Sequence, residues 1–160
     1  MILISLLIII IYILYIIINY GIPHSLSATY YFLKNKWIFS VVLAVSSMMI
    51  LPIMLSGPYS FLYFFGIVGV LFVSATPNFR DDELVDSVHT WSAIISLISS
   101  QLWVGLTNST FLCVWITFLI YLCIQLYRYK SLKKILDESN IKFYAELFML
   151  LSIYLILFFN

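Results

Sequence analysis

Apolar side chains in this 160-residue chain are grouped into six long runs, separated by short segments richer in polar and charged residues. The runs cover residues 2–18, 37–55, 59–76, 90–106, 111–127 and 143–159. Each holds 17 to 19 residues, and an α-helix of that length, rising about 1.5 Å per residue, just crosses a hydrocarbon layer of about 30 Å. Lipid cannot satisfy backbone N–H and C=O groups, so such runs must be helical. The pattern predicts an all-α fold, a single polytopic transmembrane bundle of six spans over residues 1–160.

Composition agrees with lipid as the surrounding medium. Hydrophobic residues make up 64% of the chain and charged residues 9%, whereas soluble domains carry about 25% charged residues. A net charge of +1 without a basic cluster indicates that nucleic acid is not a partner, because nucleic-acid binding depends on many Lys and Arg side chains. Membrane lipids are the expected partners.

The basic residues predict how the chain is threaded through the membrane. All of them fall in the first, third and fifth connections between the apolar runs: Lys34, Lys36, Arg80, Arg128, Lys130, Lys133, Lys134 and Lys142. With six spans these connections share one side, and loops rich in Lys and Arg stay in the cytoplasm. The first run has no basic segment before it and no small-residue cleavage pattern after it, so we expect a retained helix and not a signal peptide. The sequence therefore predicts a bacterial inner-membrane protein with both termini on the non-cytoplasmic side.

Two of these connections carry candidate functional side chains. The first contains "GIPHSLSATYY", with Ser25 and Ser27, and the third begins the stretch "TPNFRDDELVDSVHTW", which holds four of the seven carboxylates. If the fourth helix begins near residue 81 or 82, then Asp82, Asp86 and His89 fall at i, i+4 and i+7 on one stripe of that helix.

Three interpretations of this stripe stay open. Asp82, Asp86 and His89 are a candidate set of ligands for a divalent metal ion, which would activate water or hold a phosphate head group. Alternatively, Asp86 orients His89 as a general base for Ser25 or Ser27, which requires the two connections to meet. The structural interpretation is that acids favour a helix N-terminus, where Asn78 or Asp81 would act as the cap.

Glu146 is a further candidate, because it lies one turn into the last apolar run. Lys142 precedes it by four residues, which is the spacing of an ion pair on one helix face. Gly66 and Gly69 predict close packing of a neighbouring helix in the third run. Trp103 and Trp115 lie near the outer ends of two runs, where an aromatic belt would place them.

Three classes of function are compatible with these features. One is an enzyme that processes lipids or their head groups with Ser25, Ser27, Asp86 and His89. Another is a small oligomeric transporter or channel, with a polar path along the fourth helix that includes Ser96, Ser100 and Gln101. The last is a non-catalytic structural or phage-type membrane component, which needs none of these side chains.

The segments "GIPHSLSATYY" and "ATPNFRDDELVDSVH" resemble segments of uncharacterised small multi-pass membrane proteins of bacteria and bacteriophages. The resemblance covers most of the chain. It implies a multi-pass helical fold, and it implies no particular activity.

Reporter fusions at both ends and thiol labelling of an Arg80→Cys variant, with Cys113 and Cys123 replaced by serine, measure the threading. We expect both ends outside the cytoplasm and position 80 reactive only from the cytoplasmic side, because the basic connections share that side. Ends on opposite sides, or labelling of position 80 from outside, would contradict the six-span topology.

Overall fold

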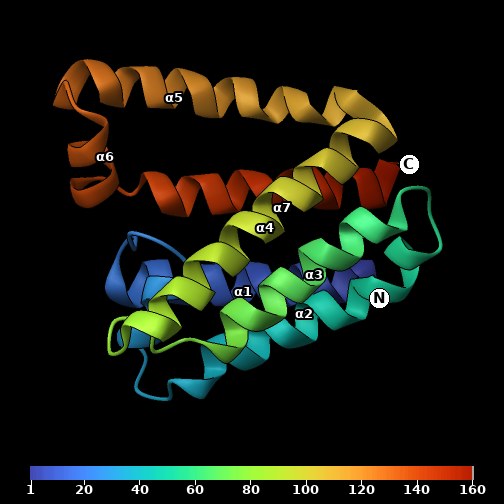
Figure 1. The fold of residues 1–160 in the computed structure, drawn as a ribbon, viewed down its shortest axis with the longest axis horizontal. Helices are drawn as coiled ribbons and strands as arrows, with labels where there is room; N and C mark the ends of the chain where they lie inside the picture. Colours follow the sequence, from blue (N-terminus) through green and yellow to red (C-terminus); the bar gives the residue numbers. More distant parts are fainter. Residues whose placement is uncertain (160) are drawn as a thin grey trace.

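The computed structural model describes the backbone of residues 1–159 and the side chains of residues 1–136 and 139–159. Over this range it is helical, without a strand (Figure 1). Its helices are α1 (Ile2–Tyr20), the 3₁₀ helix η1 (Ser27–Tyr31), α2 (Trp37–Leu55), α3 (Ser60–Ala75), α4 (Glu83–Asn108), the 3₁₀ helix η2 (Ser109–Cys113), α5 (Val114–Tyr129), α6 (Leu132–Glu138) and α7 (Ile141–Phe159). Each predicted apolar run coincides with a helix, so the predicted all-α fold is confirmed.

Within the described residues, four helical stretches are long and apolar enough to cross a membrane. They are α1, α2, the continuous stretch Glu83–Tyr129 and α7. The stretch Glu83–Tyr129 reverses direction at η2, so that α4 and α5 run antiparallel (Figure 1). Helix α3, with 16 residues, is a shorter apolar helix. These lengths and compositions identify a membrane protein.

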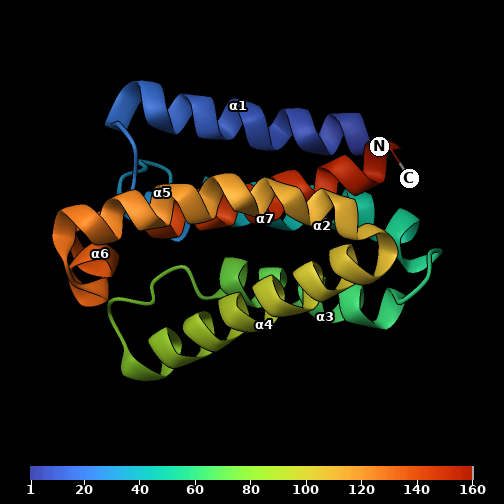
Figure 2. The same ribbon diagram turned by 90° about the horizontal axis from the view of Figure 1, so that it is seen from above.

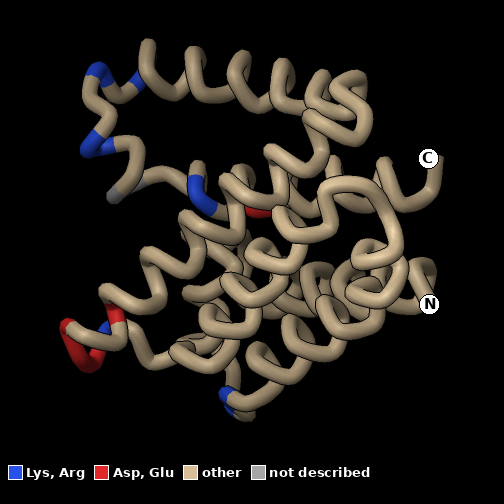
Figure 3. The backbone as a smooth tube through the Cα atoms, turned by 45° about the vertical axis from the view of Figure 1, so that its right-hand side comes forward, with Lys and Arg blue, Asp and Glu red and all other residues tan. Residues whose placement is uncertain are grey.

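Helices α2, α3 and α4 are inclined to α1, α5 and α7, and both chain ends lie at the same end of the bundle (Figures 1 and 2). Helices α1 to α4 and α7 surround a common interior, while α5 lies outside and packs mainly on α7, α6 and η2. The long connections and α6 lie at the end away from the termini. Lys and Arg residues gather toward that same end (Figure 3), which we call the basic end.

Helices α3 and α4 approach each other closely along a line of glycines and serines. A Cβ atom added to Gly69 would lie 2.6 Å from the carbonyl oxygen of Ser92 and 2.8 Å from Cβ of Ser96. One turn toward the termini, a Cβ on Gly66 would meet Cβ of Ser100 at 3.5 Å. The close neighbour expected for these two glycines is therefore α4. The face of α4 that carries Ser92, Ser96 and Ser100 packs against α3.

The expectation of an aromatic belt is wrong for Trp103. Its side chain is only 3% exposed, its ring centroid lies 5.2 Å from that of Tyr63, and its Nε1 donates to the carbonyl oxygen of Pro58 at 3.2 Å. Trp115 is half-buried, and its Nε1 donates to Oε1 of Gln101 at 2.9 Å. Both indoles find their hydrogen-bond acceptors inside the protein, which explains why a position near a helix end does not place them at the lipid surface.

Gly69→Ala tests the contact between α3 and α4. The added methyl group meets backbone atoms that cannot rotate away, so we expect a loss of about 1–3 kcal/mol in the free energy of unfolding. Gly57→Ala is the matched control, because a Cβ there meets one atom at an ordinary 3.7 Å. Denaturation of the purified protein in detergent measures both variants, and equal stability of the two would contradict the close contact.

Candidate functional site: a cavity in the helical bundle

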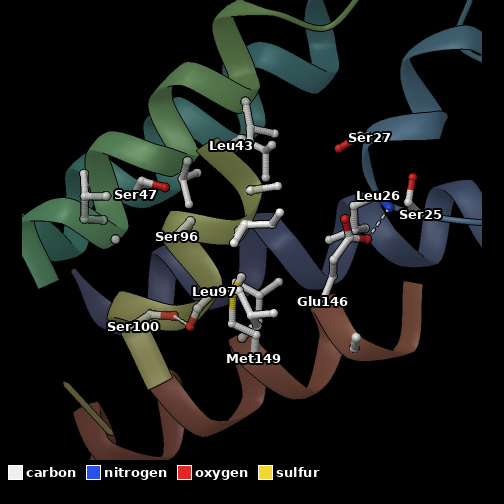
Figure 4. A pocket seen from close by; sticks show the side chains of 18 of the residues that line it. Ser25, Leu26, Ser27, Leu43, Ser47, Ser96, Leu97, Ser100, Glu146 and Met149 are labelled. Atoms are coloured by element: carbon white, nitrogen blue, oxygen red, sulfur yellow. Dashed lines mark hydrogen bonds between the residues drawn. The ribbon is translucent and has the colours of Figure 1, made fainter. Parts of the chain in front are cut away.

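A cavity of about 440 Å³ lies between helices α1, α2, α3, α4 and α7. This volume falls in the range of small-molecule sites. Most of its lining is apolar, with a few hydroxyl and charged side chains. Figure 4 shows Leu43, Leu97 and Met149 on different walls, with Ser47, Ser96 and Ser100 on one side of the cavity and Glu146 near Ser25 and Ser27 on the other.

The cavity is elongated along α4. On α4 its lining runs from Asp86 to Ser100, which at about 1.5 Å per residue corresponds to about 21 Å along the helix. An extended hydrocarbon chain can follow a cavity of this length.

The bundle is closed beyond the cavity on the side of the termini. A buried apolar cluster forms part of the deep cavity wall, through Ile9, Ile50, Tyr63, Ile67, Ile153 and Tyr154, and continues beyond it through Met54, Trp103, Val104 and Ile156. Met54 and Val104, which do not line the cavity, are at most 1% exposed. The cavity thus extends from the basic end into the bundle and stops in packed side chains.

Helices α4 and α7 both line the cavity, and they are in contact near its deep end. Helix α4 is joined to α7 by a hydrogen bond of 2.9 Å from Oγ of Ser152 to Oε1 of Gln101. Toward the basic end, α4 and α7 lie on different sides of the cavity, and both contribute lining residues. There Ile94 lines the cavity and is 39% exposed.

The first connection covers the cavity at the basic end, because it is fastened to the start of α7. The backbone N–H of Phe143 donates to the carbonyl oxygen of His24 at 3.0 Å, and the N–H of Leu26 donates to Oε2 of Glu146 at 2.6 Å. Leu26 is 7% exposed, and the neighbouring η1 is buried over its first three residues. This segment is therefore part of the folded interior.

The first and third connections are in contact. The hypothesis that His89 is a general base for Ser25 or Ser27 requires this contact. The backbone N–H of Arg80 donates to the hydroxyl of Tyr31 at 2.8 Å, and the Arg80 guanidinium lies 4.5 Å from the centre of that ring. Phe79 packs edge-on against the same tyrosine. As a result, Ser25, Ser27, Asp86 and His89 line one cavity.

His89 is held by groups other than Asp86. Its Nδ1 lies 2.9 Å from the carbonyl oxygen of Thr76, and its ring stacks on Phe79 with centroids 4.3 Å apart. A carbonyl oxygen only accepts, so Nδ1 carries the proton and Nε2 of the neutral ring is an acceptor. No hydrogen bond between described residues joins His89 to Asp86, and the orienting role expected for Asp86 belongs to Thr76.

The predicted serines differ in their surroundings. Oγ of Ser25 accepts the backbone N–H of Ala28 at 3.1 Å and so helps to start η1. Ser27 is 6% exposed and faces the cavity (Figure 4). Among the described residues no hydrogen bond joins either serine to His89. The catalytic roles of these residues stay predictions.

The predicted metal ligands are not assembled. Oδ1 of Asp82 accepts the backbone N–H groups of Leu84 at 2.8 Å and Val85 at 3.1 Å. Asp82 is therefore the N-cap of α4, in place of Asn78 or Asp81. The helix begins at Glu83, close to the start near residue 81 or 82 that the sequence analysis assumed. Residues 1–159 contain no group of three His, Cys, Asp or Glu side chains that could hold a metal ion, as far as their side chains are described.

Sequence reasoning gave Glu146 too little weight. Its carboxylate is bound to the backbone of Leu26, 120 positions away, and lies in the cavity. The available signal was a single acid within an apolar helix, which usually marks a functional position. The pairing expected with Lys142 obscured it, although both side chains line the cavity.

No family model, no curated protein and no solved structure matches this chain. Its function therefore has to be inferred from the cavity itself.

Asp82→Ala distinguishes the cap from the metal ligand. We expect a loss of about 1 kcal/mol in the free energy of unfolding, most of which Asp82→Ser restores, because serine also caps helices. Asp81→Ala is the control, since Oδ1 of Asp82 already accepts the first N–H groups. Stabilisation of the wild type by added Zn²⁺ or Mg²⁺ that is lost in both Asp82 variants would restore the metal interpretation.

Proposed function

We propose that this protein is an integral membrane protein that binds one amphiphile of lipid type in the cavity. The polar head lies at the basic end and the hydrocarbon chain extends toward the apolar cluster. The distribution of lining residues carries this proposal. Ionisable acidic and basic side chains line the cavity only toward the basic end, as Asp86, His89, Lys142 and Glu146, whereas Ile50, Met149 and Ile153 line the deeper part.

Two further features favour an amphiphile over a water-soluble ligand. The lining is largely apolar, so most of a bound chain would gain by leaving water. Ile94 lines the cavity and is 39% exposed, so we place the entry of a molecule dissolved in the bilayer at this position, between α4 and α7.

The topology extends this proposal. With six spans and the basic residues in the cytoplasm, the head group lies at the cytoplasmic face of a bacterial inner membrane. The location of both termini at the other end of the bundle supports an even number of crossings (Figures 1 and 2).

Processing of the bound amphiphile is a second candidate, and one observation favours it. The hydrogen bond to Thr76 leaves Nε2 of His89 as an acceptor at the level of the proposed head group, as a general base requires. A transporter or channel has less support, because the apolar cluster fills the bundle beyond the cavity. A continuous polar path would need that cluster to separate.

Val70→Trp tests occupancy of the cavity. Val70 lines the cavity, whereas Val68 lies in a shallow depression on the outer surface between α3 and α4. We expect Val70→Trp to weaken binding of a fluorescent single-chain amphiphile by about tenfold or more, because the indole occupies the space of the chain. Val68→Trp should bind like the wild type. Equal binding by both variants would place the amphiphile elsewhere.

A further inference from the structure

We infer that the amphiphile carries a single positive charge, as a long-chain primary amine does, and that Glu146 receives its ammonium group. This inference rests on the proposed function and specifies its ligand. It follows from the position of one carboxylate and from the balance of charges around the cavity.

Glu146 offers an oriented carboxylate to the cavity. Its Oε2 is fixed by the Leu26 N–H at 2.6 Å, and the side chain reaches across from α7 toward the segment around Ser25 (Figure 4). A carboxylate can accept about four hydrogen bonds, and Leu26 is its hydrogen-bond donor among the described residues. The side chain keeps part of its accessible surface and lines the cavity, so acceptor capacity remains for a ligand.

The residues that line the cavity include one more acid than base. The acids are Asp86 and Glu146 and the base is Lys142; Asp86 and Lys142 are exposed, and Glu146 is half-buried. His89 is neutral in the arrangement described above. Helices α2 and α3 and the segment of residues 25–27 contribute apolar, hydroxyl and phenol side chains to the lining. One ligand cation therefore balances the cavity.

The described charges outside the cavity are of both signs and exposed (Figure 3), so solvent screens them and the lining residues decide the preference. Asp81, Asp82 and Glu83 are exposed at the start of α4, which borders the charged end of the cavity. The closest cation of that connection, Arg80, lies over the ring of Tyr31. A carboxylate or phosphate head group would meet a surplus of negative charge, and its removal from water would be costly.

The ammonium of a primary amine also matches the hydrogen-bonding groups present. It has three donors and no acceptor, and the carboxylates of Glu146 and Asp86 and the hydroxyls of Ser25 and Ser27 supply acceptors at the charged end. An alcohol of the same length can use fewer of them, and it gains no charge pairing. Hydrogen bonds between charged groups are about twice as strong as those between neutral groups.

Competition among dodecylamine, dodecanol and dodecanoate tests the inference. The purified protein in phosphatidylcholine nanodiscs is loaded with the fluorescent amphiphile, and displacement by each competitor is measured. We expect dodecylamine to bind about tenfold more tightly than dodecanol, and dodecanoate to bind more weakly than both. Dodecanol is the neutral reference for the hydrocarbon chain.

Variants assign the charge preference to Glu146. In Glu146→Gln the amide oxygen still accepts the Leu26 N–H, and we expect the ratio of amine to alcohol affinity to fall close to one. Glu83→Gln, which removes a carboxylate outside the cavity, should keep the wild-type ratio. Lys142→Gln should raise the ratio, and this variant keeps the test decisive if Glu146→Gln does not fold.

The outcomes separate the two proposals. Displacement by dodecanol without a preference for the amine, or tighter binding of dodecanoate, overturns the inference on charge and leaves the amphiphile site standing. An unchanged preference in Glu146→Gln removes Glu146 from the site. Failure of the wild type to bind the fluorescent amphiphile and all three competitors overturns the proposed function itself.

Discussion

The close contact between α3 and α4 determines where the cavity lies. Gly66 and Gly69 let the serine side of α4 approach the backbone of α3, so the two helices stay in close contact between these glycines. Its attachment to α7 is different, because the hydrogen bond between Gln101 and Ser152 joins those helices near the deep end of the cavity. Helix α4 therefore forms one wall of a cavity that continues to the basic end, where the first connection covers it. Bulkier residues in α3 would change this geometry before they touched any ligand.

Several polar groups of the interior are partnered across helices. Oγ of Ser5 donates to the carbonyl oxygen of Ser46 at 2.8 Å and lies 2.5 Å from the hydroxyl of Tyr154, which links α1, α2 and α7. Oε1 of Gln101 receives hydrogen bonds from α5 and α7. Lipid offers no replacement for such partners, so these contacts fix the register of the helices. Glu146 is likewise partnered outside its own helix, by the backbone N–H of Leu26, and it also lines the cavity.

The sequence was sufficient to predict the helices and insufficient to predict their neighbours. Long apolar runs follow directly from the thickness of a bilayer, and the acidic start of α4 followed from helix capping, although the cap itself is Asp82. The pairing of Leu26 with Glu146 joins positions 120 residues apart, and no local pattern encodes it. Trp103 was misplaced for a related reason, since distance from a helix end says nothing of which face is covered. Ser25, Ser27, Asp86 and His89 were grouped by chemistry, and the fold brings them to one cavity without assembling a metal site or a hydrogen-bonded triad.

The central claim is that the cavity holds one amphiphile, and the mass of the purified protein measures this most directly. Native mass spectrometry, after removal of detergent and loosely bound lipid, should show one retained molecule per chain that dissociates at higher collision energy and is identified in the organic extract. A chain that is bare under conditions gentle enough to keep its fold would contradict the account, and so would adducts of variable number without a preferred single occupancy.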